Sequence, residues 1–366
     1  MLKRIAIDNY RCFTNFEFEP DRINLLLGRN GSGKSSFLDA ISAVVAVVVN
    51  GEDAGVAFPT ASLTRWDRRR EQRVELEVLG EPGNYIYTLA SLHDAERDRI
   101  VIRKESVTLD GRSLFSFEDG EVHLYRGDGS RGPSFEYRGK TSFLAQMEEG
   151  RDTKELMWLL EYLSGVWTVR LDARAMVATA DGEDETIDED GANFASWYRH
   201  LAQENPERLP ALWSSLAKVV PGLQWLKLVT AGRARQLVAG MVTASSPYEV
   251  DFDELSDGQR ALIALYTLLA GVNQDARCYF FDEPELHVGL SEIQPWLVEL
   301  DERLIDKGQV FVVSHHPEVV DYMAAGHAFV FERPDGGPAR VRPALFERNG
   351  GLPASVQVAR GLFHGG

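Results

Sequence analysis

The stretch that decides the fold reads Gly28-Arg29-Asn30-Gly31-Ser32-Gly33-Lys34-Ser35 and matches the pattern G-x-x-x-x-G-K-[ST] in full. Residues 23–27 before it are apolar and partly β-branched, which predicts a buried strand, and residues 36–49 predict the helix that follows. A strand, a glycine-rich turn and a helix form the context that a phosphate-binding loop requires, because backbone N–H groups at a helix N-terminus hold anions. The residues expected to contact a bound nucleotide are Asn30, Gly31, Ser32, Gly33, Lys34, Ser35 and Ser36.

Within such a loop, two side chains carry most of the chemistry. Lys34 can reach the β- and γ-phosphate oxygens, and the Ser35 hydroxyl can ligate Mg²⁺. We therefore expect ATP and Mg²⁺ as the ligands of this segment.

Length and composition allow a large folded core. The chain has 366 residues, of which 44% are hydrophobic and 26% charged, values that are ordinary for a globular protein. The formal net charge of −17 excludes a protein that coats nucleic acid with its whole surface, while a local basic patch is still compatible with it. The longest uncharged apolar run, residues 40–51, is too short to span a bilayer. We therefore expect no membrane association. The two cysteines, Cys12 and Cys278, lie in apolar segments, which predicts buried thiols in the reducing cytoplasm.

The middle of the chain has a different pattern from its two ends. Residues 74–137 contain short alternating segments separated by Gly, Asp and Pro, which predicts an antiparallel sheet with tight turns. Helical spacing begins at residue 142 and returns over residues 193–220, with breaks near Pro206 and Pro210. Between them, residues 181–190 hold seven carboxylates, which favours a solvated connection over a metal site.

A second chemical motif lies far downstream. Residues 278–283, Cys-Tyr-Phe-Phe-Asp-Glu, form an apolar segment that ends in two carboxylates, which is the form of a Walker B strand. Asp282 at the strand end is placed to hold Mg²⁺. Glu283, one residue further along, can orient and deprotonate an attacking water molecule.

Two further segments can complete a phosphate site. Ser256 and Gln259 have the spacing of a capping box at the start of an apolar helix, where a γ-phosphate could meet the helix N-terminus and Gly258 would leave room for it. The spacing alone favours a plain helix cap. The apolar strand 309–313 delivers His315 and His316 at its carboxyl end, and we prefer His315 as the γ-phosphate sensor because it directly follows the strand.

The order of these motifs resembles that of the ATP-binding-cassette superfamily. The set consists of Asn9-Tyr10-Arg11-Cys12-Phe13, the phosphate loop, Leu255-Ser256-Asp257-Gly258-Gln259, Phe281-Asp282-Glu283-Pro284 and Ser314-His315-His316-Pro317. More narrowly, it looks like the soluble branch that includes RecF, the structural-maintenance-of-chromosomes (SMC) proteins and the OLD-like ATPases. Residues 285–290 after the Walker B carboxylates are closer to the OLD-like ATPases than to transporters, although too few residues follow His316 for a Toprim nuclease domain.

The resemblance implies a role for individual residues. It implies that Arg11 contacts the nucleotide, that Glu283 and His315 are catalytic, and that Ser256 and Gly258 act on the nucleotide of a second subunit. The glutamine that contacts Mg²⁺ in this superfamily has two candidates, Gln72 and Gln146, of which Gln146 is preferred because it opens a helical segment.

From these observations we expect an α/β P-loop NTPase fold with an ABC/SMC-like nucleotide-binding domain. Residues 1–51 and 251–366 would form the ATPase domain, and residues 52–250 would form inserted β-rich and helical lobes. The expected function is ATP hydrolysis in a homodimer that regulates a separate effector, such as a nuclease, in DNA-associated processes or defence against phage. The alternatives are a RecF-like repair ATPase and a nucleotide-gated scaffold with very slow hydrolysis.

One charged segment stands apart from these motifs. Residues 65–73 contain five arginines and Trp66 in an otherwise acidic protein. The pattern favours a solvated turn, because charge runs usually are solvated. The alternative is a local contact to DNA, with the arginines on phosphates and Trp66 stacked on a base.

Overall fold

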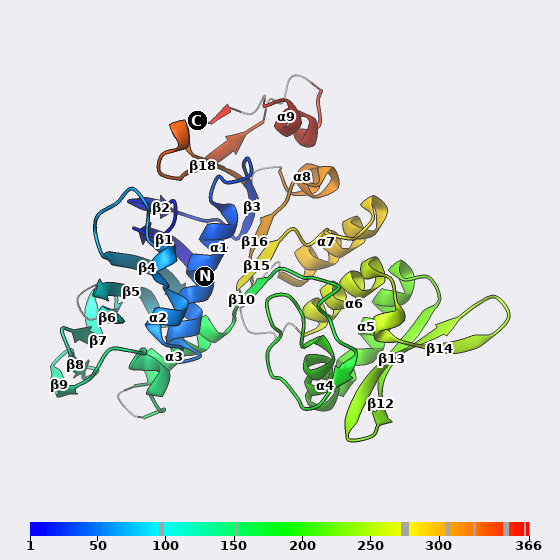
Figure 1. The fold of residues 1–366 in the computed structure, drawn as a ribbon, viewed down its shortest axis with the longest axis horizontal. Helices are drawn as coiled ribbons and strands as arrows, with labels where there is room; N and C mark the ends of the chain where they lie inside the picture. Colours follow the sequence, from blue (N-terminus) through cyan, green and yellow to red (C-terminus); the bar gives the residue numbers. More distant parts are fainter. Residues whose placement is uncertain are drawn as a thin grey trace.

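The computed structural model describes residues 1–94, 99–150, 153–271, 278–304, 308–324, 327–346, 351–361 and 364–365, and its strands form three sheets within these ranges (Figure 1). The central sheet has the strand order β10-β15-β16-β3-β17-β18-β19. Its first five strands are parallel and the last two are antiparallel additions. The strands are β10 (Val166–Val169), β15 (Cys278–Asp282), β16 (Gln309–Val313), β3 (Ile23–Leu27), β17 (Ala328–Glu332), β18 (Arg340–Leu345) and β19 (His364–Gly365).

Both faces of the central sheet are covered, which explains why its strands have continuous apolar sequences. In β3, Leu25 and Leu27 face one hydrophobic cluster and Leu26 faces the other. The cluster of Leu26 contains the helix α1 (Lys34–Val48), which follows the phosphate loop. The opposite cluster includes residues of α6 (Asp257–Ala270), α7 (Leu290–Leu304) and α8 (Pro317–Met323). The strand and helix predicted around the phosphate loop are thus confirmed.

The second sheet is antiparallel and confirms the pattern predicted for residues 74–137. Its order is β2-β1-β4-β5-β6-β7-β8-β9, and two of its tight turns, Asp110-Gly111 and Asp119-Gly120, have the positive φ angles that two-residue hairpins need. The sheet begins on the two N-terminal strands, so it is continuous with the first segment of the chain. Its strands are β1 (Leu2–Asp8), β2 (Phe16–Phe18), β4 (Glu71–Gly80), β5 (Gly83–Asp94), β6 (Arg99–Leu109), β7 (Arg112–Glu118), β8 (Glu121–Tyr125) and β9 (Arg131–Glu136).

The helices of residues 194–219 and a small third sheet lie on the other side of the central sheet, whereas the helix of residues 154–164 packs in the same cluster as the second sheet (Figure 1). Pro206 opens a short 3₁₀ turn and Pro210 lies in the first turn of α5, so both prolines separate helices as predicted. The helices are α3 (Lys154–Ser164), α4 (Phe194–Glu204) and α5 (Leu209–Val219), with short α2 (Ala54–Ala57) and α9 (Ala354–Arg360) elsewhere. The third sheet contains β11 (Thr179–Ala180), β12 (Leu223–Ala231), β13 (Ala234–Val242) and β14 (Pro247–Asp251).

One strand of the central sheet comes from an unexpected part of the chain. β10 lies inside residues 52–250, the range expected to be inserted, and pairs in parallel with the Walker B strand β15. Four residues are too short a run for periodicity to reveal a core strand. Among the described helices, none combines the length and the apolar character needed to cross a membrane.

Candidate nucleotide site

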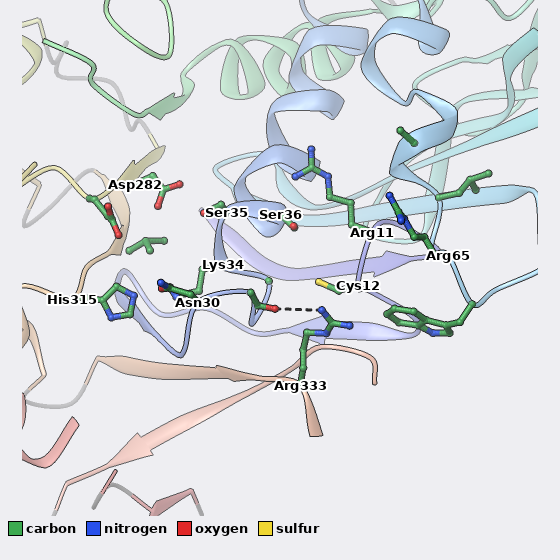
Figure 2. Close-up of a pocket in the computed structure, with 17 residues that line it drawn as sticks. Arg11, Cys12, Asn30, Lys34, Ser35, Ser36, Arg65, Asp282, His315 and Arg333 are labelled. Carbon is green, nitrogen blue, oxygen red and sulfur yellow. Dashed lines mark hydrogen bonds between the residues drawn. The ribbon is translucent and has the colours of Figure 1, made fainter. Parts of the chain in front are cut away.

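The candidate site is a pocket of about 670 Å³ at the carboxyl ends of the central strands, where ligands bind in open α/β sheets. Figure 2 shows side chains from the phosphate loop, from the ends of β15 and β16, and from the N-terminal segment pointing into one space. The lining residues are Arg11, Cys12, Asn30, Gly31, Gly33, Lys34, Ser35, Ser36, Ala61, Leu63, Arg65, Trp66, Asp282, Glu283, Val313, His315 and Arg333. The predicted residues of the phosphate loop, apart from Ser32, therefore meet those of the Walker B strand in one pocket.

The loop needs glycine at its first position for a steric reason. Gly28 has φ 146°, and a Cβ atom there would lie 2.3 Å from the Phe331 carbonyl oxygen of β17. Since this oxygen belongs to backbone, it cannot rotate away. Glycine therefore lets the loop pass directly against the sheet.

The polar groups of the loop are arranged for an anionic ligand. The Lys34 ammonium is buried and donates to the Gly28 carbonyl at 2.7 Å, so it already lies over the loop. Burial lowers the pKa of Lys34, while Asp282 and Glu283 raise it. Ser32 Oγ is buried and has no hydrogen-bond partner among the described residues. Ser32 is not among the lining residues of the pocket, whereas Lys34 and Ser35 are, so the ammonium and the Ser35 hydroxyl carry the fit of the loop to a nucleotide phosphate.

The two Walker B carboxylates differ in their backbone conformation. Asp282 is the last residue of β15, whereas Glu283 has φ 52°, in the left-handed region that is unfavourable for a side chain with a Cβ atom. The Glu283 N–H donates to the Val313 carbonyl at 2.9 Å, which fixes the turn against β16. Such local strain is held by surrounding structure and is typical of functional positions.

His315 lines the pocket, and His316 is not among its lining residues. The pKa of His315 is lowered, chiefly by burial and then by the nearby Lys34, so the imidazole is neutral at pH 7. The backbone N–H of His316 instead donates to Ser314 Oγ, which in turn donates to Glu285 Oε1 at 2.6 Å.

Oxygen ligands for Mg²⁺ are present where the sequence predicted them. Ser35 and Asp282 both line the pocket, and hydroxyl and carboxylate oxygens are the donors that Mg²⁺ prefers. Arg11 is also in the pocket and forms an ion pair with Asp39 of α1.

Other expected residues lie elsewhere. Gln146 is exposed and its amide donates to the Tyr137 hydroxyl at 3.0 Å, while Gln72 is buried and donates to backbone carbonyls of Asn9 and Ser62. Neither glutamine lines the pocket, so the structure does not bring Gln146 to the metal ligands.

The helix that was expected to face a second nucleotide starts as predicted. Ser256 caps α6, and the side chains of Ser256 and Gln259 bond each other's backbone N–H in a capping box. Ser256 is exposed, and neither it nor Gly258 lines the pocket of the same chain. The role of this helix start across a dimer stays a prediction.

The pocket also contains residues that sequence reasoning missed or assigned elsewhere. Arg333 directly follows β17, donates to the Gly31 carbonyl at 3.4 Å and lies over the Trp66 ring at 5.3 Å (Figure 2). Because Arg333 directly follows an apolar run, the sequence could have identified it as a residue at the carboxyl end of a central strand. Trp66 and Arg65, considered for DNA contact, line the same pocket as the phosphate loop. Arg69 of the same stretch is paired with Asp8 and Asp67.

Two family models and several solved structures match the chain. A model described as an AAA domain matches residues 4–121, and one described as an AAA domain, putative AbiEii toxin, Type IV TA system, matches residues 175–321. An SMC head bound to the C-winged helix domain of ScpA matches with a TM-score of 0.55 and 12% identity, covering 93% of this chain and 97% of that chain. An Smc head domain with an extended coiled coil, bound to the C-terminal domain of ScpA derived from Pyrococcus furiosus, matches with a TM-score of 0.51 and 13% identity, covering 99% of this chain and 98% of that chain. No curated protein matches the chain in sequence.

The chain has the α/β fold of a P-loop NTPase, with the architecture of an SMC head domain. The predicted fold class is thereby confirmed. The structural neighbours have low sequence identity, so their likeness establishes the architecture alone.

Proposed function

We propose that the protein binds ATP with Mg²⁺ and hydrolyses it. The observation that carries this proposal is the convergence of Lys34, Ser35, Asp282, Glu283 and His315 in one pocket. These residues come from separate parts of the chain, and their side chains supply the charges and the base that phosphoryl transfer to water requires.

Each residue has a distinct part in this reaction. Lys34 binds the β- and γ-phosphates, while Ser35 and Asp282 would hold Mg²⁺, which neutralises phosphate charge during transfer. Glu283 takes the proton of the attacking water, and His315 holds the water or a γ-phosphate oxygen by a hydrogen bond. Arg11 contacts the nucleotide from the N-terminal segment.

We further propose that hydrolysis occurs in a homodimer. The start of α6 is exposed, carries the Ser256 cap and does not reach the pocket of its own chain. The positive end of this helix favours an anionic partner, which the γ-phosphate of a second subunit would provide. ATP would thus add contacts that exist only in the closed dimer and would shift the equilibrium towards closure.

We propose that the protein is a cytoplasmic OLD-like ATPase, and that its ATP cycle regulates a separate effector protein in phage defence. The description of the second matching model as a putative toxin of a toxin–antitoxin system supports a defence role. A nuclease is the effector that the OLD-like resemblance favours. An effector that copurifies with the wild type in the presence of ATP, and not with Lys34→Ala, would support this regulation.

DNA is a second candidate ligand because Arg68 and Arg70 are exposed and show no ion pair among the described residues. Replacing both by Ala should weaken DNA binding and flatten its salt dependence, since fewer counterions would be released. Wild-type protein that does not bind DNA with ATP at low salt would exclude this role.

ATP turnover by the purified chain tests the proposed activity. We expect Mg²⁺-dependent phosphate release by the wild type and none by Lys34→Ala, which lacks the ammonium that contacts the β/γ-phosphates. Single-turnover rates would separate this enzyme from a scaffold that hydrolyses very slowly. Wild-type protein that neither binds nor hydrolyses ATP would contradict the proposal.

A further inference from the structure

Arg170, the first residue after β10, contacts both predicted metal-binding segments. Its Nε lies 3.0 Å from Oδ2 of Asp282, and its Nη2 donates to the backbone carbonyl of Ser35 at 3.0 Å. Its Nη1 forms a 2.5 Å ion pair with Asp39 of α1. One guanidinium therefore links the Walker B carboxylate to the end of the phosphate loop.

The charge balance around Arg170 shows why the guanidinium stays in place. Burial alone would lower the pKa of Arg170, but Asp39 and then Asp282 outweigh burial and raise it. The side chains of Asp39 and Asp282 are only 16% and 12% exposed, so each carboxylate has little water to replace a lost cation. Asp39 also pairs with Arg11, so the same carboxylate supports Arg170 and one arginine that lines the pocket.

The contacts of Arg170 leave the expected metal-facing atoms available. Among the described residues, they engage Oδ2 of Asp282 and the carbonyl of Ser35, and not Oδ1 of Asp282 or the Ser35 hydroxyl. Mg²⁺ demands near-ideal octahedral geometry, so the relative placement of its two protein ligands matters more than it would for a larger cation.

We propose that Arg170 is a positioning residue of the Mg²⁺ site, which holds Asp282 and Ser35 in the relative arrangement that the metal requires. The proposal rests on the proposed ATP and Mg²⁺ binding. The planar guanidinium of Arg170 pairs with Asp39, donates to the Ser35 carbonyl and lies beside Asp282 in an ion pair without a hydrogen bond from Nε. The single ammonium of Lys cannot span these three groups in the same way. Loss of a residue that orients metal ligands typically weakens metal binding by about 10–100-fold.

The test is a titration of Mg²⁺ against a fluorescent ATP analogue bound to the full chain. For each variant, the half-saturating Mg²⁺ concentration is compared with the affinity for the analogue in EDTA. Arg170→Ala should raise the half-saturating Mg²⁺ concentration by about 10-fold or more. Its affinity for the metal-free analogue should change much less, because Lys34 and the loop amides are intact.

Arg112→Ala is the matched control. Arg112 has the same side-chain exposure as Arg170, 29%, and pairs with one carboxylate, Glu155, but that carboxylate is not one of the predicted metal ligands. We expect a wild-type Mg²⁺ requirement for this control. Arg170→Lys should have a Mg²⁺ requirement between those of the wild type and Arg170→Ala. If thermal melting shows that Arg170→Ala is unfolded, the Mg²⁺ requirement of Arg170→Lys alone tests the positioning role.

The outcomes separate the inference from the function on which it rests. An unchanged or lower Mg²⁺ requirement in folded Arg170→Ala and Arg170→Lys overturns the positioning role, even though ATP still binds. Equal losses in Arg170→Ala and Arg112→Ala also overturn it, because they would reflect a general loss of structure. Wild-type protein that does not bind the analogue overturns both proposals.

Discussion

Replacing Glu283 by Gln tests the proposed base with minimal disturbance of the fold. The side chain keeps its size, and the backbone stays fixed by the N–H donated from residue 283 to the Val313 carbonyl at 2.9 Å. An amide can lie beside the water but cannot take its proton. Loss of a general base typically costs about 10²–10⁴ in rate, which corresponds to about 3–5 kcal/mol in the activation free energy.

The assay is single-turnover ATP hydrolysis, with nucleotide affinity measured in parallel. We expect the rate to fall by the factor above while ATP affinity remains within a few-fold of the wild type. Glu302→Gln, which changes an exposed carboxylate on α7, is the control and should retain wild-type turnover. Turnover of Glu283→Gln at the wild-type rate would refute the assignment.

The strained backbone of the same residue offers an independent check. Glu283 has φ 52°, and a left-handed conformation costs a residue with a Cβ atom about 1–2 kcal/mol, most of which glycine avoids. Glu283→Gly should therefore be at least as stable as the wild type in denaturant, and yet as inactive as Glu283→Gln. A large loss of stability in Glu283→Gly would show that the Glu283 side chain is there for structural reasons.

Three further perturbations test separate parts of the structure. The Ser256→Arg variant should fold and bind ATP, but it should not form the closed dimer. Mixing it with the Lys34→Ala variant should restore some ATPase activity, because the mixed dimer has one site with two intact halves. No recovery despite heterodimer formation would place both motifs in the same subunit. Gly28→Ala should lose ATP binding and at least about 2 kcal/mol of stability, since its Cβ would lie 2.3 Å from a backbone oxygen; wild-type binding by this variant would contradict the tight packing of the loop. Burial lowers the pKa of His93 from its usual 6.5 to about 4, so the unfolded chain takes up a proton at a higher pH than the folded chain does. The free energy of unfolding should therefore fall as the pH drops from 6.5 to 4, by about 3 kcal/mol at most. His93→Gln should flatten this decline in denaturation curves measured between pH 7 and pH 4, and an unchanged slope would rule out His93 as its source.

Local patterns in the sequence were enough to predict the parts of the site that are contiguous in the chain. The phosphate loop is flanked by its strand and helix, and the Walker B carboxylates follow an apolar run, so each motif has its own structural context. The capping box at Ser256 was predictable for the same reason, because both of its partners lie within one turn of helix.

Long-range packing decided the parts that sequence reasoning missed. Gln146 ends a short 3₁₀ helix rather than opening one, and its amide donates to the Tyr137 hydroxyl rather than reaching the metal ligands. Arg170 reaches the site because β10 pairs with β15, and a four-residue strand gives no periodicity from which to infer that pairing. Trp66 enters the pocket beneath Arg333, although the two residues lie at opposite ends of the sequence.

Size-exclusion chromatography with light scattering of Glu283→Gln, with Mg²⁺ and ATP present, tests ATP-driven dimer closure at the assembled site. The proposed function predicts a dimer that retains about one ATP per subunit, and a monomer when Lys34→Ala is added to the same chain. A monomer without bound nucleotide in both samples would contradict the proposed site and the function built on it.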